Sequence, residues 1–291
     1  NMVDYSFGDH SGYWNKHLVG GFMKIANEAN DEFIEKCKEF EGKVMTLFID
    51  NIRLYNRPLL SKETDLRYIK WLLENNDLLT LCEELPNNKF IIFTSHEDTP
   101  IDEYIIVPQN VLAIHAVNAL FSHHKIHPFP IGLQRQIGVD DNRLEVMKEV
   151  VEKDEYQFPT KLLYINCGLG NERNERERAY LPHFLKYEWA TCRFDPQSQF
   201  FPYSRYREFL TELKDHKFVV CPKGHGTDCH RNWETLYMRR VPIFKDEPYF
   251  RSLMQGFPVL FVKQWEDITP RLLVNSNSLY KDAPNMDLSQ L

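Results

Sequence analysis

One stretch of the sequence, Phe218–Phe244, limits the possible folds more than any other. It begins with an apolar run that ends at Cys221, continues through a loop containing Gly224 and Gly226, and then shows apolar residues at helical spacing. A second apolar run, Val241–Phe244, closes the stretch. A strand, a glycine-rich loop, a helix and a second strand in this order form a β–α–β unit, so this stretch predicts an α/β fold with a parallel sheet.

The same alternation of apolar runs and helical patterns extends along the chain. Strands are expected at Lys43–Asp50, Lys89–Thr94, Val111–Val117, Phe129–Leu133, Lys161–Cys167, Lys217–Cys221, Val241–Phe244 and Pro258–Val262. Helices are expected at Tyr13–Phe40, Asp65–Leu85, Asp140–Tyr156, Glu172–Arg178, Tyr203–Lys214 and His230–Arg239. The polar tail, Asn275–Leu291, is expected to fray.

The pattern starts again after a charged helical stretch, which places a domain boundary after residue 157. We expect two Rossmann-like α/β domains, at residues 1–157 and 158–291, facing each other across a cleft. Ligands of such sheets bind beyond the carboxyl ends of the strands. The loops expected to line this crevice are Asp9–Gly12, His96–Pro100, Gly168–Arg178 and Gly224–His230.

Composition and charge exclude several classes of protein. With 43% hydrophobic and 26% charged residues, the chain is neither intrinsically disordered nor a polytopic membrane protein. A net charge of −7 provides no global positive field, so nucleic acid is not an expected partner. No apolar run is long enough to cross a bilayer, and no membrane span is expected. The six cysteines are expected to be reduced, because a chain of this length needs no disulfides to fold.

The loop after the Lys217–Cys221 strand has the outline of an anion site. Its glycines let the backbone approach a ligand, Thr227 or Asp228 can cap the following helix, and the helix N-terminus carries positive partial charge. Lys223 and Arg231 add full charges suited to a diphosphate. The alternative to an anion site, to which we give equal weight, is that Gly224 and Gly226 only form a turn. In this alternative Arg231 pairs with Glu234 on a solvated helix face.

Other polar clusters predict less. Residue types that can bind zinc occur at Cys221, His225, Cys229 and His230. Their spacing lacks a Cys-x-x-Cys or His-x-x-His pair, so no metal is expected. A zinc-dependent hydrolase is a disfavoured alternative. The histidines at 123, 124 and 127 are interpreted as loop polarity, and Trp233 and Leu236 as core packing. Aromatic residues around Phe194–Tyr206 could stack on a base or a sugar, or lie at a domain interface.

The Phe218–Pro242 region resembles the C-terminal signature of exostosin-like glycosyltransferases. The matching residues are Cys221-Pro222-Lys223-Gly224, Cys229-His230-Arg231, Trp233-Glu234-Thr235-Leu236 and Val241-Pro242-Ile243. Weaker similarity extends to Leu162–Arg178 and Phe90–Asp98. The chain departs from the family pattern at Arg239-Arg240, where small residues are usual, and it is short for the family.

The resemblance implies a GT-B arrangement of two domains and an inverting, metal-independent sugar transfer from a nucleotide donor, with no cofactor required. A UDP-sugar, such as UDP-xylose, UDP-galactose or UDP-glucuronate, is the implied donor, with Glu234 on its ribose and Arg178 on its diphosphate. Arg173 and Arg176 are ambiguous, because charge runs usually lie on solvated faces. The donor-binding residues expected on this basis are Arg178, Lys223, Gly224, His225, Gly226, Thr227, Asp228, Arg231 and Glu234.

An inverting transfer needs a base for the acceptor hydroxyl. His96, Glu97 and Asp98 are the candidates, with Asp98 at the family position, although Asp98 could instead cap a turn. Asp9 and His10 are further candidates for the base.

The expected acceptor is an oligosaccharide or glycoprotein glycan bound by the N-terminal domain. Alternatives are a GDP-sugar transferase and a non-catalytic module that binds a nucleotide-sugar or a glycan. The absence of an anchor and of any Asn-x-Ser/Thr glycosylation sequence favours a cytoplasmic enzyme. Such an enzyme would be bacterial or virus-encoded. A virus-encoded enzyme is expected in the host-cell cytosol. A Golgi-lumen location is expected only if the sequence is a trimmed domain.

Overall fold

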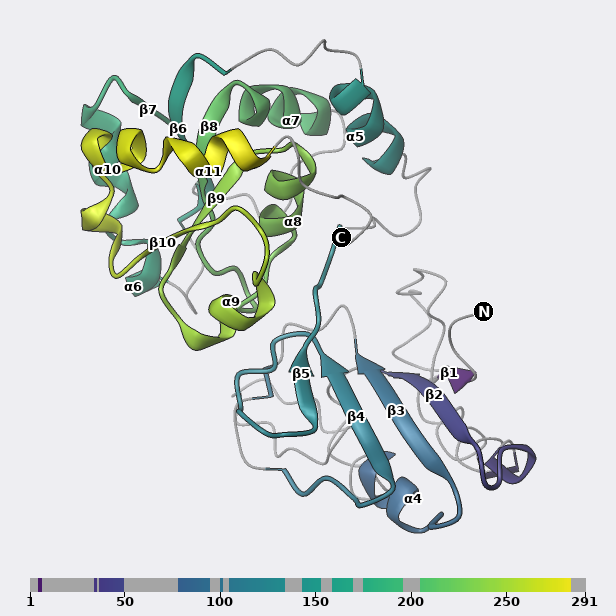
Figure 1. Cartoon of the computed structure of the whole chain (residues 1–291). Helices are drawn as coiled ribbons and strands as arrows, with labels where there is room; N and C mark the ends of the chain where they lie inside the picture. The colour runs from purple at the N-terminus through teal and green to yellow at the C-terminus, as the bar shows by residue number, and fades with distance from the viewer. Residues whose placement is uncertain are drawn as a thin grey trace. The chain divides into compact units, whose positions relative to one another are not determined.

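The computed structural model describes residues 5–6, 34–35, 37–49, 78–94, 100–101, 105–133, 143–152, 159–169, 175–195 and 205–283. The chain divides into two compact units, Asn1–Ile131 with Gln136–Gly138 (unit 1) and Gly132–Arg135 with Val139–Leu291 (unit 2). Each unit is built on a parallel β-sheet (Figure 1). The predicted α/β class with two parallel sheets is therefore confirmed.

Unit 1 contains a sheet in the order β1-β2-β3-β4-β5, in which all neighbouring strands are parallel. The strands are β1 (Tyr5–Ser6), β2 (Val44–Ile49), β3 (Lys89–Thr94), β4 (Val111–Ala116) and β5 (Ile126–Pro128), and the helix α4 spans Leu78–Glu83. The strand expected at Phe129–Leu133 is wrong, because β5 ends at Pro128 and Pro130 has no N–H with which to extend the ladder.

Unit 2 contains a sheet in the order β10-β9-β8-β6-β7, again with parallel pairs. Its strands are β6 (Lys161–Gly168), β7 (Ala190–Asp195), β8 (His216–Val220), β9 (Val241–Lys245) and β10 (Leu260–Val262). Its helices are α5 (Arg143–Glu152), α6 (Glu175–Arg178), α7 (Tyr206–Lys214), α8 (His230–Tyr237), α9 (Pro248–Leu253), α10 (Pro270–Asn275) and α11 (Asn277–Asp282), with the 3₁₀ helices η2 (Leu181–Lys186) and η4 (Trp265–Asp267).

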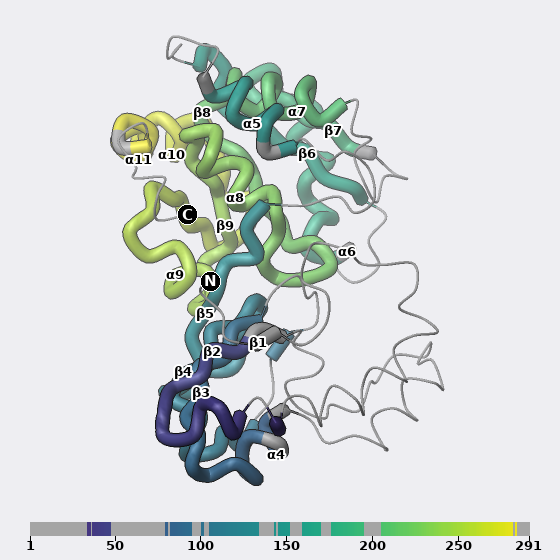
Figure 2. Tube along the Cα trace, turned by 90° about the vertical axis from the view of Figure 1, so that its right-hand side faces the viewer, coloured from purple at the N-terminus to yellow at the C-terminus, as the bar shows by residue number. Residues whose placement is uncertain are grey.

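The helix α5 belongs to unit 2, where it packs against α7 (Figure 2). The lysine Lys214 of α7 donates a hydrogen bond to the carbonyl oxygen of Val150, and Arg207 pairs with Glu149 at 2.6 Å. The division between the units thus precedes α5, whereas the boundary expected after residue 157 follows it.

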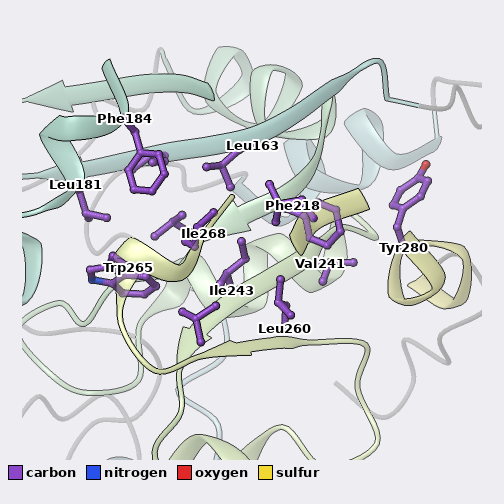
Figure 3. Close-up of a cluster of buried hydrophobic side chains, with 14 of the residues drawn as sticks. Leu163, Leu181, Phe184, Phe218, Val241, Ile243, Leu260, Trp265, Ile268 and Tyr280 are labelled. Atoms are coloured by element: carbon purple, nitrogen blue, oxygen red, sulfur yellow. The ribbon is translucent and has the colours of Figure 1, made fainter. Parts of the chain in front are cut away.

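Both faces of the unit 2 sheet are covered, as expected for strands with buried apolar runs such as Phe218–Val220 of β8. On one face, β6, β8, β9 and β10 pack against η2, η4, α10 and α11 in a continuous hydrophobic core (Figure 3). On the other face, α7 presents Tyr206, Phe209, Leu210 and Leu213, which recur at helical spacing and are all buried.

The end of the described chain is part of this core. Tyr280 and Ala283 are buried, at 2% and 0% exposure, so the expectation of fraying from residue 275 is wrong through residue 283. In the sequence these two residues stand among many polar ones, and such a sparse apolar pattern is easily interpreted as a tail. Among the residues placed by the structure, no helix has both the length and the apolar character to cross a membrane.

We predict that Tyr280→Ala lowers the free energy of unfolding by about 3 kcal/mol, because it empties a fully packed site in the core. The matched control is Val274→Ala on α10, whose side chain is 63% exposed and whose loss costs less than about 0.5 kcal/mol. Urea denaturation followed by tryptophan fluorescence measures both. Equal effects of the two substitutions would show that α11 is not anchored through Tyr280.

Candidate functional site

The candidate site lies in unit 2, at the carboxyl ends of β6 and β8. These strands are neighbours, and from them the chain winds in opposite directions, to β7 on one side and to β9 and β10 on the other. In doubly wound sheets, ligands bind in the crevice at such a reversal of strand order. The described strands of unit 1 follow one another in sequence order and contain no reversal.

Arg178, the last residue of α6, bridges the loops that follow β6 and β8. Its Nε donates a hydrogen bond to the carbonyl oxygen of Lys223 at 3.0 Å, its Nη2 donates to the same oxygen, and its Nη1 donates to the carbonyl oxygen of Gly168. Arg178 is only 8% exposed, and none of the ion pairs within the described residues includes it. A buried guanidinium group whose partners are neutral oxygens favours an anion nearby.

The short helix α6 is held in place by contacts outside itself. The carboxylate of Glu177 pairs with Lys245 Nζ at 2.8 Å, and Trp265 Nε1 donates to the carbonyl oxygen of Glu177 at 2.8 Å. These contacts fix the residue just before Arg178, which orients the guanidinium group. Of the other arginines that the sequence left ambiguous, Arg176 is exposed and Arg173 lies outside the described residues.

Arg231, near the start of α8, also reaches the end of β6. Its Nη1 donates to the carbonyl oxygen of Asn166, and its guanidinium carbon lies 4.3 Å from the centroid of the Phe209 ring. Its Nε lies 3.4 Å from Glu234 Oε2, with side-chain exposures of 16% and 7% for the two residues. The pairing of Arg231 with Glu234 in the alternative interpretation is therefore present, but the solvated helix face is wrong, because Glu234 is buried and Arg231 is only partly exposed.

The carboxylate of Glu234 has a second partner in the hydroxyl group of Tyr206. Burial, together with this carboxylate, raises the pKa of Tyr206, so its hydroxyl group stays protonated and donates. Glu234 is thus engaged by Arg231 and Tyr206 within the protein. The contact with a donor ribose that the resemblance implies stays a prediction.

The glycine loop is closely packed around Cys229. A Cβ atom on Gly224 would lie 2.7 Å from Cys229 Sγ, and the Gly224 N–H donates to the carbonyl oxygen of Gly226 at 3.1 Å. The Cys229 thiol in turn lies 3.8 Å from the carbonyl oxygens of Pro222 and Gly226. A side chain at residue 224 would therefore have to displace the Cys229 thiol.

The carboxylate of Asp228 points into the protein, not into the loop mouth. Its oxygens accept hydrogen bonds from Asn232 Nδ2 at 2.8 Å and from Trp233 Nε1 at 3.0 Å, and the residue is 1% exposed. The N-cap of α8 is Cys229, with no side-chain capping bond, so the expectation that Thr227 or Asp228 caps this helix is wrong. Asp228 instead fixes the loop onto α8.

The remaining loop residues occupy different environments. Lys223 is partly buried and pairs with Glu247 at 2.7 Å, whereas His225 is exposed and Thr227 is buried. Within the residues that the structure places, Arg178 and Arg231 both bond main-chain oxygens near the end of β6, and Arg178 also bonds the main chain of Lys223. The expected base residues at 96–98, like Asp9 and His10, lie outside the described residues.

The cysteines and histidines of this region lie in different environments, with Cys221 buried and His225 exposed. Burial raises the pKa values of the Cys221 and Cys229 thiols to about 12. His230 Nδ1 is hydrogen-bonded to the carbonyl oxygen of Gly132 at 2.8 Å. No group of three or more metal-binding side chains occurs in the part of the chain that the structure describes. Trp233 and Leu236 are buried, at 2% and 0% exposure, which confirms their prediction as core residues.

Neither a scan against models of protein families nor a search of curated proteins finds a match to this chain. The likeness to exostosin-like glycosyltransferases therefore rests on the quoted residues alone and stays a prediction. Several site residues were also missed from the sequence, namely Asn166, Glu177, Phe209, Lys245 and Glu247. Asn166 carried a signal, because a polar amide stands out in an otherwise apolar strand.

We predict that Gly224→Ala lowers the free energy of unfolding by about 1–2 kcal/mol, because the added methyl group collides with Cys229 Sγ. In a Cys229→Ala background the same substitution is expected to cost less than about 0.5 kcal/mol. A double-mutant cycle by urea denaturation measures this coupling. The same cost in both backgrounds would mean that Gly224 is needed for another reason.

Proposed function

We propose that the protein is a glycosyltransferase that transfers a sugar from a nucleotide donor, a UDP-sugar, to a hydroxyl group of a glycan acceptor with inversion. In this proposal unit 2 binds the donor, unit 1 binds the acceptor, and the two units adopt a GT-B arrangement. The order of residues from Cys221 to Ile243 and the doubly wound sheet of unit 2 support it. Two alternatives are a non-catalytic module that binds a nucleotide-sugar and a transferase that uses a GDP-sugar. The predictions distinguish the proposed function from both.

The observation that carries the proposal is the pair of guanidinium groups of Arg178 and Arg231 at the switch point of the sheet. Both are held by main-chain oxygens at the end of β6, and both belong to residues that are largely buried. Two cations at the crevice where ligands of such sheets bind suit the two phosphates of a nucleoside diphosphate. The start of α8, which has no side-chain cap, adds partial positive charge.

The same cations suit the chemistry of group transfer. When the bond between the anomeric carbon and the diphosphate breaks, negative charge develops on the leaving phosphate. Fixed guanidinium groups can stabilise that charge without having to reorganise, because Arg178 is held through three hydrogen bonds. A base on the acceptor side, for which Asp98 is our candidate, takes the proton of the attacking hydroxyl group.

Titration calorimetry tests the donor site. UDP, GDP and CMP are titrated in EDTA into the wild-type protein and into Arg178→Ala and Arg231→Ala. We expect UDP to bind selectively and each substitution to weaken it by about 30-fold or more, because each removes a charge from the phosphates.

The matched control is Arg176→Ala, which removes an exposed arginine from the same helix and leaves the affinity unchanged. Selective GDP binding would point to the other donor class. No binding of any nucleotide would contradict the proposal.

A second prediction separates an enzyme from a binding module. Asp98→Asn is expected to lower turnover of UDP-sugar by at least about 100-fold while UDP affinity stays unchanged, because the base acts on the acceptor alone. Turnover is measured as the release of UDP in the presence of a panel of acceptors. The turnover of Glu97→Gln in the same assay is the comparison for Asp98→Asn. Tight UDP binding without turnover in the wild-type protein would favour the module, and full turnover in Asp98→Asn would move the base elsewhere.

A further inference from the structure

The carboxylate of Glu234 lies within a chain of contacts that joins three helices of unit 2. It lies 3.4 Å from Arg231 Nε, one turn earlier on α8, and it accepts a hydrogen bond from Tyr206, the first residue of α7. The guanidinium carbon of Arg143, the first residue of α5, lies 5.1 Å from the centroid of the Tyr206 ring. The chain of contacts thus runs from α5 through α7 to the arginine that the proposed function places on the donor diphosphate.

These four side chains are shielded from solvent to different degrees. Arg143, Tyr206 and Glu234 are buried, and the side chain of Arg231, next to them, is 16% exposed. Removing a carboxylate from water is costly unless charged or hydrogen-bonding partners inside the protein compensate for it. Arg231 and Tyr206 are such partners, so the carboxylate of Glu234 is already engaged within the folded protein.

Three contacts hold the guanidinium group of Arg231 in place. Its Nε faces the carboxylate of Glu234, and its Nη1 donates to the carbonyl oxygen of Asn166. Its flat face lies over the ring of Phe209, with the guanidinium carbon 4.3 Å from the centroid. Contacts at two edges and one face restrain both the plane of the group and its rotation within that plane. An arginine side chain is otherwise flexible, so the loss of one contact lets the group turn away from a ligand.

We propose that Glu234 and Tyr206 are positioning residues, which hold the guanidinium group of Arg231 for the phosphates of the donor. The inference rests on the proposed function and gives Glu234 a different role from the ribose contact that the resemblance implies. Tyr206 acts through Glu234, and Arg143 supports the ring of Tyr206 from α5.

The possible roles of Glu234 predict different effects on an anion that has no ribose. If Glu234 bound the ribose, its substitution would leave the affinity for inorganic pyrophosphate unchanged. If Glu234 acted only through its negative charge, its neutralisation would tighten pyrophosphate binding, because a repulsive charge would be lost. A positioning role predicts weaker binding of pyrophosphate and of nucleotide alike.

Titration calorimetry in EDTA tests the positioning role with Glu234→Gln and Tyr206→Phe. The probes are inorganic pyrophosphate and whichever of UDP and GDP the wild type prefers. Tyr206→Phe changes no charge, because burial raises the pKa of Tyr206 and keeps its hydroxyl group protonated. We expect Glu234→Gln to weaken both probes by about tenfold and Tyr206→Phe to weaken both by about threefold.

A double-mutant cycle with Arg231→Ala separates positioning from a general effect on the fold. If Glu234 acts through Arg231, Glu234→Gln in the Arg231→Ala background changes the nucleotide affinity by less than about twofold. A tenfold loss that persists in this background would overturn the inference.

The matched control is Tyr280→Phe, which removes the hydroxyl group of a buried tyrosine on the other face of the sheet. We expect it to change neither affinity, and an effect equal to that of Tyr206→Phe would overturn the inference. Urea denaturation confirms that each variant is folded before its affinities are compared.

The remaining outcomes distinguish this inference from the proposed function. Weaker nucleotide binding with unchanged pyrophosphate binding in Glu234→Gln would establish the ribose contact, which overturns the inference while the proposed function stands. Tighter pyrophosphate binding in Glu234→Gln, or unchanged affinities in both variants, would also overturn it. A wild-type protein that binds neither nucleotide nor pyrophosphate would contradict the proposed function, and the inference with it.

Discussion

The site in unit 2 depends on one interaction, the bridge that Arg178 makes between the carbonyl oxygens of Gly168 and Lys223. These oxygens lie at the carboxyl end of β6 and in the loop after the neighbouring strand β8, so a single guanidinium group ties these two segments together. The bridge also explains why so many contacts converge on a helix of one turn. Glu177, Lys245 and Trp265 hold α6 in the position that the bridge requires.

The doubly wound sheet provides the place for this bridge. Because β6 has β7 on one side and β8 on the other, the connections on its two sides cover opposite faces of the sheet, and a crevice opens between them. Arg178 enters this crevice from the segment that leads to β7, and Arg231 enters it from the helix that leads to β9. Two cations from separate β–α units thus reach the end of the same strand.

The periodicity of the sequence predicted the sheet of unit 2 well, because apolar runs such as Lys161–Cys167 are buried on both faces and bounded by loops. It missed β7, whose alternating residues include Arg193, and it placed the fifth strand of unit 1 too late, where prolines interrupt the ladder. The spacing of Arg231 and Glu234 predicted a shared helix face. Their burial could not be predicted, because it depends on Phe209 and Tyr206 of α7, which approach only in the folded chain.

Main-chain oxygens hold both guanidinium groups of the site, and this has a consequence for how the sequence can vary. A carbonyl oxygen is present whatever side chain its residue carries, so the bonds from Arg178 to residues 168 and 223 do not depend on the identity of either. Selection on these bonds acts on the path of the backbone and on the arginine itself. Related chains could therefore keep the same geometry while the residues around it drift, leaving a trace in structure that outlasts the trace in sequence.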